Sequence, residues 1–225
     1  MMERKAILFF VCSLVALSLL NLFGCQGAKV VRRQPASFEG LEKCLQPAVP
    51  SEDADAKQRC VYLLERFLDE KVDEPKAGEA AFRLGQLYLE TGDYSAAYRI
   101  FQRYPEEHPE GRRQTKARLY LGVSLYFLEN PTDSLDVLHA LAEDPDAVRW
   151  EKEIFRYIAE NYVKLERLPS ALTWYARCYE SMEEDAGRER LEDRILEVMC
   201  VGWEPEALQA ATELFQEGFF AEAIQ

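Results

Sequence analysis

The apolar residues between positions 78 and 182 follow a helical period along the chain. Three small residues inside these apolar stretches, Gly85, Gly122 and Ala159, stand at a constant interval of 37 residues. A fixed interval of this size is typical of proteins built from repeated helix pairs. The pattern therefore predicts an all-α fold in which each repeat contributes two antiparallel helices.

Turn residues divide these repeats into helices. Thr91-Gly92-Asp93 separates the two helices of the first pair, and we expect Pro105 to end the second of them. Pro131 suits a first helical turn, where a missing N–H is tolerated. The expected pairs are Gly78–Glu90 with Tyr94–Tyr104, Thr115–Leu128 with Pro131–Leu141, and Val148–Leu165 with Pro169–Met182.

The repeats continue less regularly on both sides, within a helical domain assigned to residues 51–225. A leading helix is expected over Ser51–Lys71. After residue 187 the interval of 37 predicts helices at Arg188–Val201 and Glu204–Gln216, whereas residues 211–223 match the repeat in another frame. In that second frame the sequence stops within a helix, so we expect either a truncated module or one that completes its last repeat against a partner.

The first 24 residues have the pattern of an export signal. A charged head precedes an apolar run over residues 6–20, and Leu22-Phe23-Gly24-Cys25 follows. A single membrane-spanning helix is the alternative, since the apolar stretch is just long enough. The ending resembles the lipobox of bacterial lipoproteins, which implies cleavage before Cys25 and lipid on that cysteine.

The residues that follow the lipobox are polar and without helical period. We expect residues 25–50 to hold the lipidated cysteine and a flexible tether. In the sorting rule of enterobacterial lipoproteins, an Asp after the cysteine retains the protein in the inner membrane. Gln26 stands there, so the resemblance implies the periplasmic face of the outer membrane.

Four cysteines remain after Cys12 leaves with the signal and Cys25 is lipidated. Because export leads to an oxidising compartment, an even number permits disulfides. Pairing Cys44 with Cys60 and Cys178 with Cys200 gives the shortest loops, but the sequence leaves the connectivity open. The alternative is that all four are small buried hydrophobic residues.

Charge and histidine content exclude several functions. The net charge of −13 repels phosphate backbones, so no nucleic-acid partner is expected. The two histidines, His108 and His139, lie far from any cysteine, and neither a catalytic triad nor an EF-hand spacing is present. We therefore expect a protein that is not an enzyme and has no metal or cofactor.

The first repeat resembles the tetratricopeptide pattern of small and aromatic residues. It contains Ala81-x-x-Leu84-Gly85-x-x-Tyr88, then Gly92-Asp93-Tyr94 and Ala97-x-x-x-Phe101. The resemblance implies a right-handed solenoid whose concave groove, lined by the first helix of each pair, receives a protein or peptide partner. Carried over by position, the groove residues are Phe82, Gln86, Leu89, Leu119, Val123, Tyr126, Arg156, Glu160 and Val163.

The groove prediction has an alternative. Neighbouring helices or the tether could cover the apolar members, Phe82, Leu89, Leu119 and Tyr126, which would then be core. The third repeat mixes Arg156 with Glu160, which departs from the subclass of the family that clamps carboxylate termini.

Export, lipidation and helical repeats together resemble two families of outer-membrane lipoproteins. These are the repeat-bearing component of the β-barrel assembly machinery and the activators of penicillin-binding proteins. The resemblance implies a scaffold for protein–protein interactions in cell-envelope assembly. The alternatives are the N-terminal module of a longer penicillin-binding-protein activator and a solute-binding lipoprotein.

Overall fold

The computed structural model describes residues 40–46, 54–70, 76–109, 113–182 and 186–202. The regular elements among these residues are all helical, as the sequence predicts. In chain order they are α2 (Leu41–Leu45), α3 (Ala54–Glu70), α4 (Ala77–Thr91), α5 (Tyr94–Glu107), α6 (Gln114–Phe127), α7 (Pro131–Ala142), the 3-10 helix η1 (Pro145–Trp150), α8 (Glu151–Lys164), α9 (Leu168–Glu180) and α10 (Ala186–Gly202).

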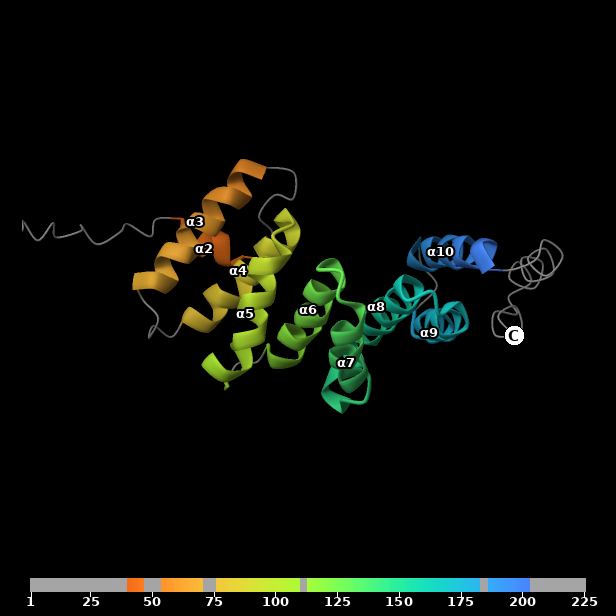
Figure 1. The fold of residues 1–225 in the computed structure, drawn as a ribbon. Coiled ribbons are helices and arrows are strands. Elements are labelled where there is room, and N and C mark those ends of the chain that lie inside the picture. Colours follow the sequence, from red (N-terminus) through yellow and green to blue (C-terminus); the bar gives the residue numbers. More distant parts are fainter. Residues whose placement is uncertain (1–39, 47–53, 71–75, 110–112, 183–185, 203–225) are drawn as a thin grey trace, which may run out of the picture. The chain divides into compact units, whose positions relative to one another are not determined.

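The helices pack as successive antiparallel pairs, α4 with α5, α6 with α7 and α8 with α9 (Figure 1). Each pair also contacts the next, because α5 lies against α6 and α7 against α8. The first helices of neighbouring pairs meet as well, α4 with α6 and α6 with α8, whereas α10 packs mainly on α9. The three predicted helix pairs are therefore confirmed.

The small residues of the repeat lie where the two helices of a pair approach closely. A Cβ placed on Gly85 would lie 2.6 Å from the ring of Phe101, and one on Gly122 would lie 2.8 Å from the side chain of Leu138. Ala159, at the third small site, is fully buried. The constant interval of 37 residues thus marks the seam of each pair.

Most helix boundaries differ from the predictions by one to three residues, and two of these differences have a clear local cause. Pro105 does not end its helix, since α5 continues to Glu107. A proline in the last turn removes only its own N–H bond, and the His108 N–H still donates to the Tyr104 carbonyl at 3.0 Å. The third pair does not begin at Val148 as an α-helix, because Pro145 opens the 3-10 turn and α8 starts at Glu151.

A disulfide joins Cys44 of α2 to Cys60 of α3, as in one of the two short-loop pairings. Leu41 and Cys44 are buried against α3 and α4, so α2 belongs to the helical domain. The tether therefore ends before α2, and not at residue 50 as predicted from the sequence. The other pairing is wrong, because Cys178 and Cys200 are free, the first buried and the second exposed.

Polar bonds at a second interval connect the first helices of neighbouring pairs. Glu79 accepts from Arg113 at 3.1 Å, and Gln86 donates to the Tyr120 hydroxyl at 3.2 Å. Glu160 binds Arg194 in the same way, and each of the three pairs is 34 residues apart. The repeat interval is 37 residues, so a partner 34 residues away lies about one helical turn before the residue that occupies the same place in the next repeat.

The predictions for the export signal, for Cys25, for residues 26–39 and for a helix at Glu204–Gln216 lie outside the described residues. Among the helices that are described, none is both long and apolar enough to cross a membrane.

Candidate functional site

Three of the apolar residues predicted to line the groove are buried in the core instead. Phe82, Leu119 and Val123 are 3%, 3% and 5% exposed. The ring of Phe82 packs edge-on to Tyr104 at 5.8 Å, and Tyr120 of the next repeat covers it at 5.7 Å. The alternative, that neighbouring helices cover these side chains, is the correct one. Apolar residues that face the next repeat become core as soon as that repeat packs on them.

Four other predicted groove residues are half-buried. Leu89 and Val163 pack at the edge of the core formed by α6 to α10. Gln86 donates a hydrogen bond to the Tyr120 hydroxyl. The ring of Tyr126 lies 5.5 Å from that of Tyr157, with the Lys164 ammonium 3.9 Å from its centroid. Through these contacts the side chains help to join one repeat to the next.

The last two predicted groove residues, Arg156 and Glu160, line a cavity between α8 and α10 over α9. Its volume is about 620 Å³, within the range of about 300–1,000 Å³ that ligand sites commonly have. The residues around it are Lys152, Glu153, Arg156, Glu160, Cys178, Met182, Gly187, Arg190, Leu191 and Arg194. The cavity exists because α10 packs mainly on α9, which leaves α8 partly uncovered.

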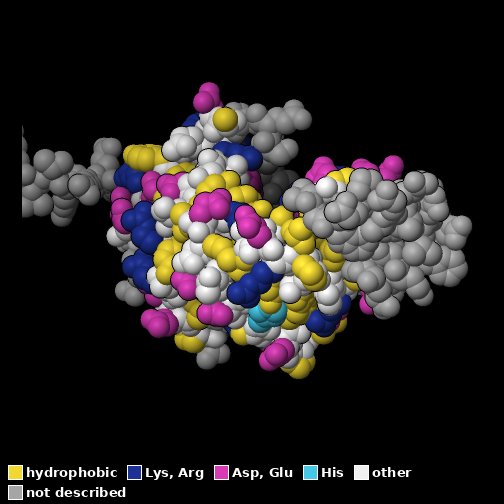
Figure 2. All heavy atoms as spheres, turned by 45° about the vertical axis from the view of Figure 1, so that its right-hand side comes forward, with side chains coloured by type: hydrophobic (Ala, Val, Ile, Leu, Met, Phe, Trp, Pro, Cys, Tyr) yellow, Lys and Arg dark blue, Asp and Glu magenta, His cyan; other side chains and the backbone are white. Residues whose placement is uncertain are grey.

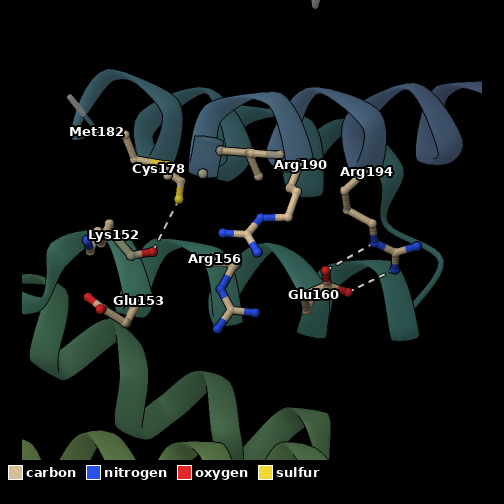
Figure 3. Close-up of a pocket in the computed structure, with 10 residues that line it drawn as sticks. Lys152, Glu153, Arg156, Glu160, Cys178, Met182, Arg190 and Arg194 are labelled. Atoms are coloured by element: carbon tan, nitrogen blue, oxygen red, sulfur yellow. Dashed lines mark hydrogen bonds and ion pairs between the residues drawn. The ribbon is translucent and has the colours of Figure 1, made fainter. Parts of the chain in front are cut away.

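Cations predominate in the cavity lining. Four of the side chains are basic and two are acidic. Arg194 neutralises one of the acids, because its Nε lies 3.1 Å from Glu160 Oε1 and its NH2 lies 2.9 Å from Oε2 (Figure 3). This fork of hydrogen bonds raises the pKa of Arg194, so its guanidinium stays protonated.

Two arginines of the cavity remain unpaired. Arg190 extends from α10 toward α8, whereas the guanidinium of Arg156 is turned away from α10 (Figure 3). Both side chains are exposed. Neither guanidinium forms an ion pair or hydrogen bond with another residue of the described part of the chain. The ring of Tyr157 lies 4.4 Å below the guanidinium carbon of Arg156, which holds that charge by a cation–π contact.

The repeat register shows that Arg156 is exceptional at its position. It stands 37 residues after Leu119, which itself stands 37 residues after Phe82. The first two repeats bury an apolar side chain there, whereas the third presents a charged one to solvent. This change within the register is the sequence signal for the cavity. Lys152, Arg190 and Arg194 have no such signal, because only the packing of α10 brings them to the same space.

The charge of the cavity contrasts with that of the surface elsewhere. On the face shown in Figure 2, Lys and Arg side chains are interspersed with Asp and Glu, with apolar side chains between them. The whole chain has a net charge of −13. An excess of cations in one concave place on an acidic protein concentrates small anionic groups there.

The cysteine that lines the cavity is not an activated nucleophile. The Cys178 thiol donates to the Lys152 carbonyl at 3.2 Å, and burial raises the pKa of that thiol to about 11, so it stays protonated. His139 lies elsewhere, with its Nε2 3.1 Å from the Tyr162 hydroxyl. Within the described ranges, no group of three His, Cys, Asp or Glu side chains could hold a metal ion.

Comparison with known proteins agrees with this architecture. Residues 54–119 match the family described as Tetratricopeptide repeat. The solved structure of MamA 41-end from Desulfovibrio magneticus RS-1 is 16% identical, with a TM-score of 0.59 over 83% of this chain and 92% of that chain. The MamA RS-1 ArsTM double mutant is 14% identical, with the same TM-score and coverage. No curated protein matches the chain in sequence. At these identities the likeness concerns the fold, which is a tetratricopeptide-like stack of helix pairs.

Proposed function

We propose that this chain is a protein-binding scaffold, held by lipid on Cys25 at the periplasmic face of the outer membrane, that serves cell-envelope assembly. Tetratricopeptide-like stacks typically bind other proteins and do not catalyse reactions. The observation that carries the proposal is the cavity between α8 and α10, a concave site that presents unpaired charges to solvent.

The location in the envelope is supported by two features of the chain. The sequence Leu22-Phe23-Gly24-Cys25 follows an apolar run in the manner of a lipobox. The bond between Cys44 and Cys60 fits an oxidising compartment, because cytosolic thiols are kept reduced. Two or more acyl chains on Cys25 would make membrane residence long-lived, at about 0.8 kcal/mol per buried CH₂.

The anchor is tested by radiolabelled palmitate in cells that express the chain. Wild type should take up label and fractionate with membranes, whereas Cys25→Ser should lose the label. Cys12→Ser is the matched control, because it changes a cysteine within the apolar run, and it should behave as wild type. Label that persists in Cys25→Ser would exclude this anchor.

The scaffold role is tested by a photo-crosslinking amino acid in the cavity wall at Met182, in intact cells. The control position is Val148, which is 59% exposed and does not line the cavity. We expect one recurrent adduct at Met182 that is absent at Val148, and the purified adduct partner should bind the purified chain. The same adducts at both positions, or a partner from outside the envelope, would contradict the proposal.

A further inference from the structure

We infer that a pocket between α4 and α5 receives an aromatic side chain of a partner protein, with an acidic residue beside that side chain bound by Arg99. The inference goes beyond the proposed function, which rests on the cavity between α8 and α10. The pocket has a volume of about 360 Å³, within the range of ligand sites. It is lined by Tyr88, Ala96, Arg99, Ile100, Gln102 and Arg103.

The pocket lies on the side of α5 that faces α3. The hydroxyl of Tyr88 donates to the Glu65 carboxylate of α3, and Ile100 packs against the core formed by α2, α3 and α4. Tyr88 and Ile100 are half-buried, whereas Arg99 and Arg103 are exposed, so an apolar floor has a basic rim. Because α5 is the second helix of its pair, the pocket is not part of a groove lined by first helices.

The repeat register shows which other part of the fold is equivalent to this pocket. The hydrogen bond between Tyr88 and Glu65 recurs as the bond between Tyr162 and His139, and both pairs are 23 residues apart. The second pair follows the first after two intervals of 37 residues. The junction of α3, α4 and α5 therefore corresponds to the junction of α7, α8 and α9.

The later junction contains an aromatic ring that the earlier one lacks. Trp174 stands at the place of Ile100, and its half-buried ring lies 5.0 Å from that of His139. Arg177, at the place of Arg103, has its guanidinium carbon 4.3 Å from the centroid of Trp174. Among the described residues, no ring lies under Arg103 in this way. A ring supplied by a partner would restore the contact, because aromatic faces attract both rings and guanidinium groups.

The basic rim specifies an acidic residue beside the ring. Arg99 has no ion pair or hydrogen bond with another residue of the described part of the chain. Arg103 Nε lies 3.4 Å from Glu107 Oε1, so its charge is partly balanced. A carboxylate at Arg99 can accept two parallel N–H bonds. Trp, Tyr and Arg dominate the binding energy of many protein interfaces, which favours a protein as the source of the ring.

The test measures the fluorescence anisotropy of the fluorescein-labelled peptide Gly-Ser-Trp-Asp-Ser-Gly, mixed with the full-length chain in detergent. Leu in place of Trp should weaken binding about fivefold or more, because Leu has no aromatic face for Arg103. Asn in place of Asp should weaken binding about twofold to fivefold, as expected for an exposed ion pair. Added NaCl should weaken the Asp peptide more than the Asn peptide.

Methyl NMR locates the bound peptide. In a chain labelled with ¹³C at the isoleucine δ1 methyl groups, the Trp peptide should shift the signal of Ile100 through the ring current of the indole. The signal of Ile158, which is fully buried in another part of the core, should stay unchanged and is the internal reference.

Variants of the chain test the two contacts separately. Ile100→Trp introduces the side chain that the third repeat has at this place, so it should close the pocket and abolish binding while the melting temperature is kept. Arg99→Gln should remove the difference between the Asp and Asn peptides. Arg149→Gln is the matched control for the second variant, because Arg149 is exposed and does not line the pocket, and it should leave both peptides unchanged.

Several outcomes would overturn the inference. These are equal binding of the Trp and Leu peptides, an unshifted Ile100 methyl signal, and full binding by a folded Ile100→Trp variant. Displacement by indole-3-acetate at the same concentration as unlabelled peptide would identify a small-molecule site and overturn the assignment to a protein. If the Trp peptide fails to bind while the Met182 adduct persists, the scaffold function stands and this inference alone falls.

Discussion

The size of facing side chains sets how closely the two helices of a repeat approach. Phe101 lies over Gly85, and Leu138 lies over Gly122, so a large residue on one helix accompanies the absence of a side chain on the other. Ser134 Oγ also donates to the Gly122 carbonyl at 2.8 Å and accepts from Asn161 Nδ2 at 2.8 Å. The seam thus combines complementary volumes with a buried polar bridge to the next repeat.

Gly85→Ala should destabilise the fold. The added methyl group would overlap the Phe101 ring, and overpacking costs about 1–3 kcal/mol, which exceeds the gain of about 1 kcal/mol in helix propensity. Urea unfolding followed by circular dichroism measures the change. In a Phe101→Leu background the same substitution should lose its penalty, and equal penalties in both backgrounds would show that the ring is not the cause.

The stability of the protein should fall with pH through the range of His139. Burial lowers the pKa of His139 below its ordinary value of about 6.5, against the opposing charges of Glu143 and Asp136. As the pH falls below about 6.5, the unfolded chain binds a proton that the folded chain does not, so folding weakens. Melting temperatures between pH 7.5 and pH 5 should drop less steeply for His139→Gln than for wild type, and parallel profiles would contradict this.

Individual residues show where sequence reasoning succeeds and where it fails. The small positions Gly85 and Gly122 were predictable, because each recurs after 37 residues and each lies where the two helices of its pair make close contact. The exposure of the groove residues was not predictable, since the burial of Phe82 and Leu119 depends on the next repeat and not on their own helix. Arg190 entered the site only through the position of α10.

Among the elements, the helices of the repeats were predictable to within a few residues, and the exceptions have local causes. Pro105 and Pro145 have different effects because the first falls in a last turn and the second opens a short 3-10 helix. The five-residue helix α2 could not be predicted from its length, because so short a helix is unstable alone. The disulfide to Cys60 and the bond from Arg83 Nε to the Cys44 carbonyl, at 3.2 Å, hold it in place.

Reduction of this disulfide should destabilise the N-terminal end of the fold. The two cysteines are 16 residues apart, and a loop of this size corresponds to about 3 kcal/mol in the chain-entropy description. Dithiothreitol should lower the unfolding midpoint of wild type to that of Cys44→Ala with Cys60→Ala, a variant that should not respond to the reductant. Cys178→Ala with Cys200→Ala should keep the full response, and loss of the response there would point to a different pairing.

Over the whole helical stack, each repeat depends on its neighbours alone. Glu79 with Arg113, Gln86 with Tyr120 and Glu160 with Arg194 connect consecutive first helices at the same separation of 34 residues. In such a stack, stability is close to a sum of repeat terms and nearest-neighbour interface terms. A change at one interface should therefore remain local.

Glu160→Gln should loosen α10 and leave α4 unchanged. The Glu160 side chain is 14% exposed and the Arg194 side chain 38%, so the lost pair corresponds to about 1 kcal/mol. Amide hydrogen exchange should become about fivefold faster across α10. The matched variant Glu79→Gln should act instead at α4 and α6, and a uniform acceleration along the chain would show that the stack unfolds as one unit.

The covalent link between α2 and α3 also defines a mechanical path. Tension applied to the chain ahead of residue 40 reaches the fold at α2, and the bond from Cys44 to Cys60 passes it directly to α3. The chain between the two cysteines then bears none of the load. A pull from the N-terminal side is therefore resisted by the 17-residue helix α3 and the helices that pack on it.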